Sequence, residues 1–200
     1  KSMREVKKTA TGFSIGAAVP CAALTENKAL AKAWPGLVEA AGLIGSKQVQ
    51  GRCTISGNLC NAGPAADSVP AMVAAGAKAV IQGPKGKRTV PVEAIPVGPG
   101  KTSLKKGELV ESIVLPARKP KSGDAYLRFI PRSEMDIAVV SAGVNLTLDS
   151  KGVVTDARVA LGAVAPTVLL VAAAAKAIIG TKLDDAALEK LGEAASAACR

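Results

Sequence analysis

Histidine is absent from this chain of 200 residues, and cysteine is scarce. Without histidine, the chain cannot contain a Ser-His-Asp triad, a Cys-His nucleophile pair, a histidine-ligated zinc or copper, or a histidine proton shuttle. No pair among Cys21, Cys53, Cys60 and Cys199 has the C-x-x-C spacing of a zinc knuckle or an iron–sulfur loop. We therefore interpret all four as free, mostly buried thiols, which indicates a reducing, cytoplasmic location.

Aromatic residues make up only 2% of the chain, namely Phe13, Trp34, Tyr126 and Phe129. Proteins that bind single-stranded nucleic acid stack its bases on aromatic side chains, so nucleic acid is a weak prediction despite the net charge of +10. That charge is uneven, because residues 1–117 contain 15 basic and 7 acidic side chains. The excess indicates an anionic partner, such as a phosphate group or an acidic protein face, or else a solvated surface.

Long apolar runs are also missing. The longest, residues 168–179, is interrupted by Lys176 and is shorter than the roughly 20 residues that span a bilayer. No membrane span is therefore predicted. With 48% hydrophobic and 21% charged residues, the composition excludes disorder and a collagen-like structure, and the length suits one domain or two small ones.

The pattern of apolar residues, glycines and prolines predicts a mixed, mostly antiparallel α+β fold. A linker-like stretch at residues 117–123 marks the predicted domain boundary. The predicted strands are 12–19, 77–82, 87–92, 108–115, 124–130, 137–148 and 153–164, with a hairpin turn at 149–152. The predicted helices are 22–33, 35–42, 68–76, 166–179 and 184–198.

The apolar residues of segment 45–64 follow neither the helical nor the strand period, so this segment is predicted to be a loop. Functional sites often lie in loops that a rigid scaffold holds in place. Within this segment, Ser56 and Gly57 are small and are flanked by the hydroxyl of Thr54 and the amide of Asn58. Such residues let backbone N–H groups surround a phosphate. The same pattern also suits a tight turn stabilised by the asparagine, so both interpretations stay open at this point.

Four segments, in order along the chain, resemble one family. Residues 54–71 read T-I-S-G-N-L-C-N-A-G-P-A-A-D-S-V-P-A. They are similar to the T-I-G-G-N…A-S-P-x-x-D-x-x-P-A element of the FAD-binding medium subunits of molybdenum hydroxylases, the xanthine dehydrogenase and carbon monoxide dehydrogenase group. Residues 97–104 (V-G-P-G-K-T-S-L), 108–116 (E-L-V-E-S-I-V-L-P) and 125–140 (A-Y-L-R-F…R…D-I-A-V-V) resemble later elements of that family.

The resemblance covers essentially the whole chain and implies two domains. Residues 1–117 would form an FAD-binding α/β domain of the PCMH type, N-terminally truncated because the family's first glycine loop, of the A-G-G-T-D type, is missing. Residues 122–200 would form a C-terminal domain like that of the CO dehydrogenase flavoprotein, with a small antiparallel sheet plus helices.

The resemblance also implies a cofactor site for FAD. The family's second glycine loop, whose backbone holds the FAD pyrophosphate, matches Thr54, Ile55, Ser56, Gly57 and Asn58. Asp67 matches the acid that binds the adenosine portion, and the positions near the flavin are matched by Ile44, Val110, Tyr126 and Arg128. Two departures are that Ser56 replaces a glycine and that Arg128 stands where lysine is common.

In such a complex, substrate is oxidised at a molybdenum cofactor in a large subunit, and electrons pass through [2Fe–2S] clusters in a small iron–sulfur subunit to FAD on the medium subunit. The resemblance therefore implies a cytoplasmic, hetero-oligomeric oxidoreductase subunit that passes electrons to an acceptor, with no catalytic acid or base and no metal of its own. One alternative is an assembly module that has kept the fold but lost FAD. A weaker one is a domain that binds phosphate or nucleic acid.

Asp136, Tyr126 and the two loop cysteines each have a structural and a functional interpretation. Asp136 either pairs with Arg132 or contacts the cofactor. Tyr126 is either a core residue with its hydroxyl in water or a flavin neighbour. Cys53 and Cys60 flank the loop, but the sequence shows no electropositive setting for a redox thiol, so structural thiols are the favoured interpretation.

Overall fold

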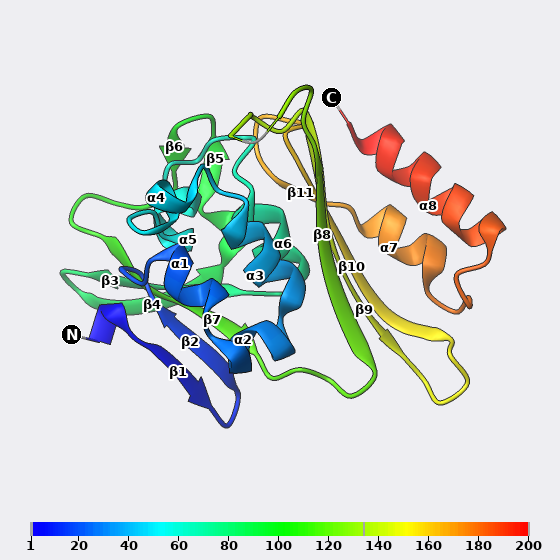
Figure 1. The fold of residues 1–200 in the computed structure, drawn as a ribbon, viewed down its shortest axis with the longest axis horizontal. Helices are drawn as coiled ribbons and strands as arrows, with labels where there is room; N and C mark the ends of the chain where they lie inside the picture. Colours follow the sequence, from blue (N-terminus) through cyan, green and yellow to red (C-terminus); the bar gives the residue numbers. More distant parts are fainter. Residues whose placement is uncertain (1, 134, 200) are drawn as a thin grey trace.

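The computed structural model describes residues 2–133 and 135–199. A five-stranded sheet and a four-stranded sheet enclose a layer of short helices, and two further helices cover the outer face of the smaller sheet (Figure 1). This arrangement confirms the predicted α+β fold with antiparallel strand pairing. None of the helices in the described part of the chain combines the length and the apolar character needed to cross a membrane.

The five-stranded sheet has the order β1-β2-β7-β3-β4, and each neighbouring pair is antiparallel. A two-stranded ribbon, β5-β6, lies between β4 and β7 in the sequence. The strands are β1 (Val6–Thr9), β2 (Gly12–Gly16), β3 (Lys78–Gly83), β4 (Gly86–Pro91), β5 (Pro96–Gly98), β6 (Lys101–Thr102) and β7 (Leu109–Pro116).

Six short helices make up the helical layer, and the apolar side chains of all but the helix at residues 47–50 form the larger hydrophobic core with β2, β3 and β7. They are α1 (Cys21–Thr25), α2 (Lys28–Ala33), α3 (Pro35–Gly42), α4 (Lys47–Gln50), α5 (Ile55–Cys60) and α6 (Ser68–Ala74), and two 3₁₀ turns are Ser2–Arg4 and Val92–Ala94. Because none exceeds eight residues, packing rather than helix propensity stabilises them.

The C-terminal part forms a four-stranded sheet of order β11-β10-β9-β8, in which all neighbours are antiparallel. A second core lies between this sheet and its two outer helices. The elements are β8 (Ser122–Phe129), β9 (Val140–Leu148), β10 (Val154–Gly162), β11 (Leu169–Leu170), α7 (Ala172–Ile178) and α8 (Asp185–Ala198). Strand β8 lies at the edge and turns alternate side chains, including Tyr126, toward the helical layer.

Helix α6 is buried along its whole length and packs directly on the backbone of β9 and β10. A Cβ atom placed on Gly143 would lie 2.6 Å from the carbonyl oxygen of Pro70, and one on Gly162 would lie 2.7 Å from Cγ of Pro70. Glycine at both positions therefore permits the close approach of α6 to the smaller sheet.

The segment between the two sheets is held by Arg118. Its Nη2 lies 3.0 Å from Oδ1 of Asp124, its Nη1 donates to Asn145, and its guanidinium carbon lies 4.3 Å from the ring centroid of Trp34. The other carboxylate oxygen of Asp124 accepts the N–H of Leu37 in α3. Burial raises the pKa of Asp124 although Arg118 opposes this shift. The linker-like stretch is thus tied to both the helical layer and the smaller sheet.

Several helices and strands in the structure differ in extent from those predicted from the sequence. The predicted helix 22–33 is two helices, because the Asn27 side chain accepts the N–H of Leu30 and starts a new one. The predicted loop contains α4 and α5, whose N-caps are Ser46 and Thr54. The predicted helix 166–179 begins only at residue 172, because residues 169–170 pair with β10. Strand β1 was not predicted, strand 12–19 ends at residue 16, and strand 137–148 begins at 140.

We expect Gly143→Ala to lower the free energy of unfolding by about 2 kcal/mol, because its methyl group cannot fit against α6 without displacing it. Gly123→Ala is the matched control, since Gly123 lies on the neighbouring strand and a Cβ there meets no atom within 4 Å. Urea denaturation of the two variants measures the difference. Equal stability of both would show that α6 and β9 do not pack as described.

Candidate functional site

The first turn of α5 contains the residues predicted to hold a phosphate. The side chain of Thr54 caps this helix by accepting the N–H of Gly57 at 2.8 Å. The N–H groups of Ile55 and Ser56 lie in the same turn, where a helix supplies no backbone acceptor of its own. Ser56 has helical backbone geometry, so its replacement of glycine introduces no positive φ. The turn thus presents two N–H groups beside a fixed cap.

Asn58 connects this turn to α6. Its Oδ1 accepts both the N–H of Ser68 at 3.2 Å and the hydroxyl of Ser68 at 2.7 Å. The sequence pattern did not single out Ser68 as the partner of Asn58, because the two residues are ten positions apart and no local motif links them. The carbonyl oxygen of the Asn58 side chain therefore has a structural role, and its NH₂ group is the part that a ligand could use.

Asp67, which precedes α6, forms a buried network with strand β8. Its Oδ1 accepts the hydroxyl of Tyr126 at 2.9 Å, and its Oδ2 lies 2.9 Å from Nη1 of Arg128. The side chains of Arg128 and Asp67 are only 8% and 13% exposed. Burial raises the pKa of the Tyr126 phenol, so it remains a proton donor at neutral pH. The structure thus brings three predicted site residues into direct contact, and the tyrosine hydroxyl lies on Asp67 rather than in water.

A small hollow of about 170 Å³ lies beside Arg128. Its other lining residues come from the end of α3 and from α4: Gly42, Leu43, Gly45, Ser46, Lys47 and Gln50. Gln50 is 3% exposed and donates from Nε2 to the carbonyl oxygen of Gly42, whereas its Oε1 has no partner among the described residues. The sequence analysis did not identify Gln50, because a glutamine in a short helix carries no distinguishing signal.

The two predicted apolar positions occupy different surroundings. Ile44 is half-buried, packs against the larger core and lies between Leu43 and Gly45 of the hollow. Val110 is 6% exposed on β7, the strand against which α5 packs. Ile44 is therefore flanked by two residues that line the hollow beside Arg128, and Val110 lies on the strand that α5 contacts.

Ser56 gives a direct test of whether this site suits an anionic cofactor. Its side chain is 3% exposed, and its hydroxyl has no hydrogen-bond partner among the residues that the structure describes. A buried hydroxyl without a partner costs free energy unless a ligand or water satisfies it. The hydroxyl lies in the same helical turn as the N–H groups of Ile55 and Ser56, which are donors of the kind that bind a phosphate group.

The two interpretations of Asp136 are distinguished by its side-chain contacts. Arg132 donates to both carboxylate oxygens of Asp136 at 3.0 Å, and Asp136 also accepts the N–H of Ile137. Arg132 lowers the pKa of Asp136. The pairing interpretation of Asp136 is therefore the one that the structure shows. In the described residues, no cluster of three or more His, Cys, Asp or Glu side chains could hold a metal ion.

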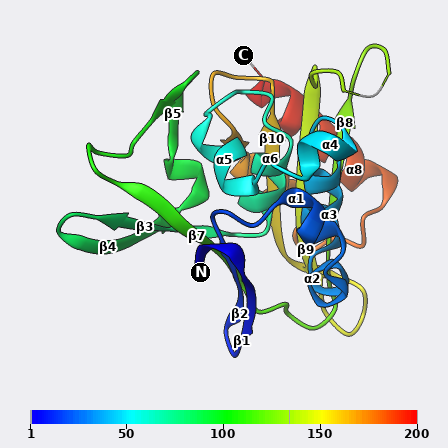
Figure 2. The same cartoon turned by 60° about the vertical axis from the view of Figure 1, so that its left-hand side comes forward.

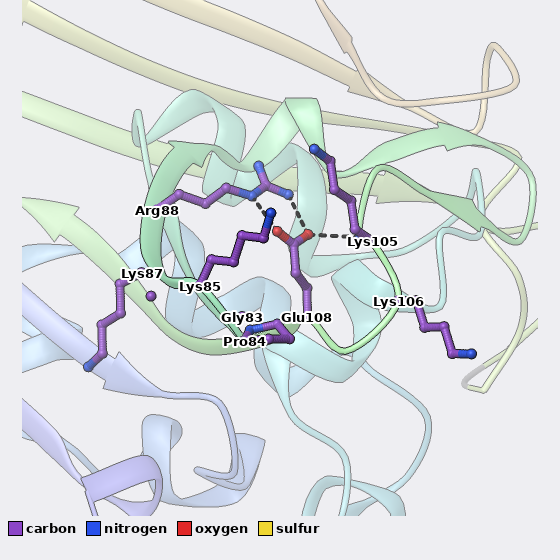
Figure 3. Close-up of a pocket in the computed structure, with 9 residues that line it drawn as sticks. Gly83, Pro84, Lys85, Lys87, Arg88, Lys105, Lys106 and Glu108 are labelled. Carbon is purple, nitrogen blue, oxygen red and sulfur yellow. Dashed lines mark hydrogen bonds and ion pairs between the residues drawn. The ribbon is translucent and has the colours of Figure 1, made fainter.

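A second hollow, of about 390 Å³, lies at the β3–β4 hairpin and the turn before β7 (Figure 3). Figure 2 shows this hairpin extending away from the four-stranded sheet, so the hollow is separate from the Asp67 network. Arg88 donates to both oxygens of Glu108, and the N–H of Lys105 donates to Oε2. Figure 3 shows Lys85 and Lys105 on the same side as this pair. The pair fixes the hairpin to the turn, and nothing in it resembles a flavin site.

Acid titration tests the hairpin pair. The hydrogen bonds from Arg88 lower the pKa of Glu108 from the usual 4.5 to about 2. Because the pKa is lower in the folded state, the stabilisation is complete above pH 4.5 and is lost as the pH falls toward 2. Glu108→Gln should therefore lose less stability over this range than the parent. Glu193→Gln, at an exposed residue of α8, is the control for removal of a surface carboxylate. The measurement is the urea midpoint of each protein between pH 4.5 and 2. An identical pH dependence for Glu108→Gln and the parent would contradict a stabilising ion pair between Arg88 and Glu108.

Removing the acid of the Asp67 network should leave a buried cation without a partner. We expect Asp67→Ala to lower the free energy of unfolding by about 3 kcal/mol. The double variant Asp67→Ala with Arg128→Met should regain most of this loss, because it removes both charges. Urea denaturation gives both values. A double variant no more stable than Asp67→Ala would show that the buried charge is not the cause.

Comparison with known proteins identifies the family of both parts of the chain. Residues 1–118 match the model of the FAD binding domain in molybdopterin dehydrogenase, and residues 125–200 match the CO dehydrogenase flavoprotein C-terminal domain. The chain is 34% identical over 185 residues to the carbon monoxide dehydrogenase medium chain of Afipia carboxidovorans, which covers 92% of this chain and 64% of that one. It is 33% identical over 154 residues to the xanthine dehydrogenase FAD-binding subunit of Escherichia coli O157:H7.

A solved structure shows the same fold. The carbon monoxide dehydrogenase of Hydrogenophaga pseudoflava contains a chain that superimposes with a TM-score of 0.94 and 32% identity, covering all of this chain and 69% of that one. The alignment with the E. coli subunit covers 76% of this chain and 52% of that protein, so this chain spans about half the length of that relative.

The matches of both halves of the chain to family models thus place it in an FAD-binding class of protein. The chain belongs to the family of FAD-binding subunits of molybdopterin dehydrogenases, the molybdenum hydroxylase group that includes carbon monoxide and xanthine dehydrogenases.

Proposed function

We propose that this chain is the flavin-binding electron-transfer component of a molybdenum hydroxylase or dehydrogenase. Its partners would be a large molybdenum subunit, where substrate is oxidised, and a small subunit with [2Fe–2S] clusters, in a cytoplasmic hetero-oligomer. Bound FAD supplies a carrier that accepts electrons from those clusters and passes them to an acceptor. The observation that carries the proposal is the donor set at the first turn of α5, next to the Asp67 network.

The turn at Thr54 would bind the FAD pyrophosphate. The N–H groups of Ile55 and Ser56 and the hydroxyl of Ser56 would donate hydrogen bonds to its oxygens, while the Thr54 side chain fixes the turn by accepting the N–H of Gly57. Backbone donors stabilise the phosphate charge without a lysine at this position. The NH₂ group of Asn58 adds a further donor, because its carbonyl oxygen is already bound to Ser68.

The Asp67 network would orient the remaining parts of the cofactor. Asp67 can accept a ribose hydroxyl of the adenosine portion through the lone pairs that Tyr126 and Arg128 leave unused. Arg128 would place a positive charge near the electron-rich edge of a reduced flavin, and Tyr126 keeps the carboxylate in position. Ile44 and Val110 would supply apolar walls. None of these groups donates or accepts a proton during electron transfer.

The two domains would have different tasks. We propose that residues 1–117 form the FAD-binding domain, which contributes the phosphate turn and Asp67. Residues 122–200 form the C-terminal domain, which contributes Tyr126 and Arg128 through β8. Because Asp67 bonds to both residues of β8, cofactor binding would depend on contact between the two domains.

The visible absorption spectrum of the full-length protein, purified with the subunits that accompany it, is the test. We expect flavin bands and close to one FAD per chain after release of the chromophore. Ser56→Ala should raise the Kd for FAD about tenfold, because a charge-assisted hydrogen bond to the pyrophosphate is lost. Ser196→Ala, at an exposed serine of α8, should leave the Kd unchanged.

The absence of bound FAD would favour the alternative, an assembly module that has kept the fold but lost the cofactor. A colourless protein that also fails to take up added FAD would overturn the flavoprotein proposal. FAD bound equally well by Ser56→Ala and the parent would show that the cofactor lies elsewhere than the α5 turn.

A further inference from the structure

Two cysteines that are distant in the sequence meet beside the phosphate turn. Cys21 is the first residue of α1, and Cys53 immediately precedes Thr54. The N–H of Cys21 donates to the carbonyl oxygen of Cys53 at 2.9 Å, and the nearby Cys53 side chain contributes to raising the pKa of the Cys21 thiol. Both are free thiols in this structure. The backbone hydrogen bond and the proximity of the two thiols bring the side chains within reach of a disulfide.

The two thiols differ in their access to solvent. Cys21 is 0% exposed, and burial, followed by the proximity of Cys53, raises the pKa of its thiol. Cys53 is only half-buried. An oxidant in solution therefore reaches Cys53 first. Cys21 is protected from solvent but lies next to Cys53. This division suits one cysteine that reacts with the oxidant and a second that resolves the product.

We propose that Cys21 and Cys53 are a modification site at which a hydroperoxide, such as hydrogen peroxide, forms a disulfide. In the first step the Cys53 thiolate attacks a peroxide oxygen, so that an S–O bond forms, the O–O bond breaks, and the leaving hydroxide takes a proton. In the second step the sulfur of Cys21 attacks the sulfenic acid, an S–S bond forms, and water leaves with the thiol proton. Two electrons pass from the thiols to the peroxide, which becomes two water molecules.

The cross-link would constrain the backbone that leads into the α5 turn. Cys53 is covalently adjacent to Thr54, whose side chain caps the turn at Gly57. A disulfide to Cys21 would fix this segment to α1 and to the core in which Cys21 and Leu24 lie. An influence on FAD exchange rests on the proposed function, because it requires the α5 turn to be the pyrophosphate site. Formation of the disulfide itself does not depend on it.

The other two cysteines are internal controls. Cys60, at the end of α5, has a thiol whose pKa burial raises, and Cys199 is exposed at the end of α8. Cleavage after lysine and arginine gives a peptide of residues 9–28 that contains only Cys21, and a peptide of residues 53–78 that contains Cys53 and Cys60. Fragmentation of a linked pair therefore identifies which sulfur carries the bond.

The experiment treats the full-length protein, with the subunits that accompany it, with hydrogen peroxide and analyses the chain by mass spectrometry. We expect the loss of two hydrogen atoms and a linked pair of residues 9–28 and 53–78, joined through Cys21 and Cys53, which dithiothreitol reverses. The Tm should rise by about 5 °C in the cross-linked form and return on reduction. Cys60→Ser with Cys199→Ser should form the same link.

Cys53→Ala and Cys21→Ala are the variants that should lose both the link and the rise in Tm. Cys53 is half-buried, so its variant keeps the test valid if the core substitution at Cys21 fails to fold. Two free thiols after treatment, a sulfinic acid on Cys53, or a link to Cys60 would each overturn the proposal. A link that forms in a protein unable to bind FAD would leave this proposal standing and reject the proposed function alone.

Discussion

The close approach of α6 to the smaller sheet is the constraint on which the site depends. All seven residues of α6 are buried, and Gly143 and Gly162 leave room for Pro70 in its first turn. A helix in this position cannot shift without collision, because protein interiors are close-packed. Residues at its N-terminal end are therefore fixed relative to both sheets. Asp67 and Ser68 are those residues, and each reaches a different part of the site.

From this fixed point the site extends in two directions. Ser68 binds Asn58 and so holds the helix whose first turn presents the N–H groups of Ile55 and Ser56. Asp67 binds Tyr126 and Arg128 and so holds the edge strand β8. Tyr126 is only 1% exposed, and it belongs to the larger core although its strand belongs to the smaller sheet. The site is thus assembled from elements that neither sheet could position alone.

Local signals in the sequence predicted most of the fold, since turns, caps and alternation are properties of neighbouring residues. The hairpin of β9 and β10 was predicted from the turn at 149–152, and Gly152 has the expected positive φ of 78°. The short helices α4 and α5 were missed because four to six residues show no periodicity. The predicted set Asp67, Tyr126 and Arg128 came from a family resemblance, whereas the contacts among them, and that between Cys21 and Cys53, depend on packing that no local pattern encodes.

Serine at position 56, where the family has glycine, bears on whether the chain has lost its cofactor site or has kept it in a modified form. A serine is costly only where the backbone requires a positive φ, and Ser56 lies in the first helical turn of α5, where φ is negative. Its substitution therefore leaves the turn intact. The added hydroxyl is buried and lacks a partner among the described residues, which would be a net cost in a module without a ligand. That cost is removed if a phosphate oxygen accepts the hydroxyl, so Ser56 favours a chain that has kept its anionic cofactor.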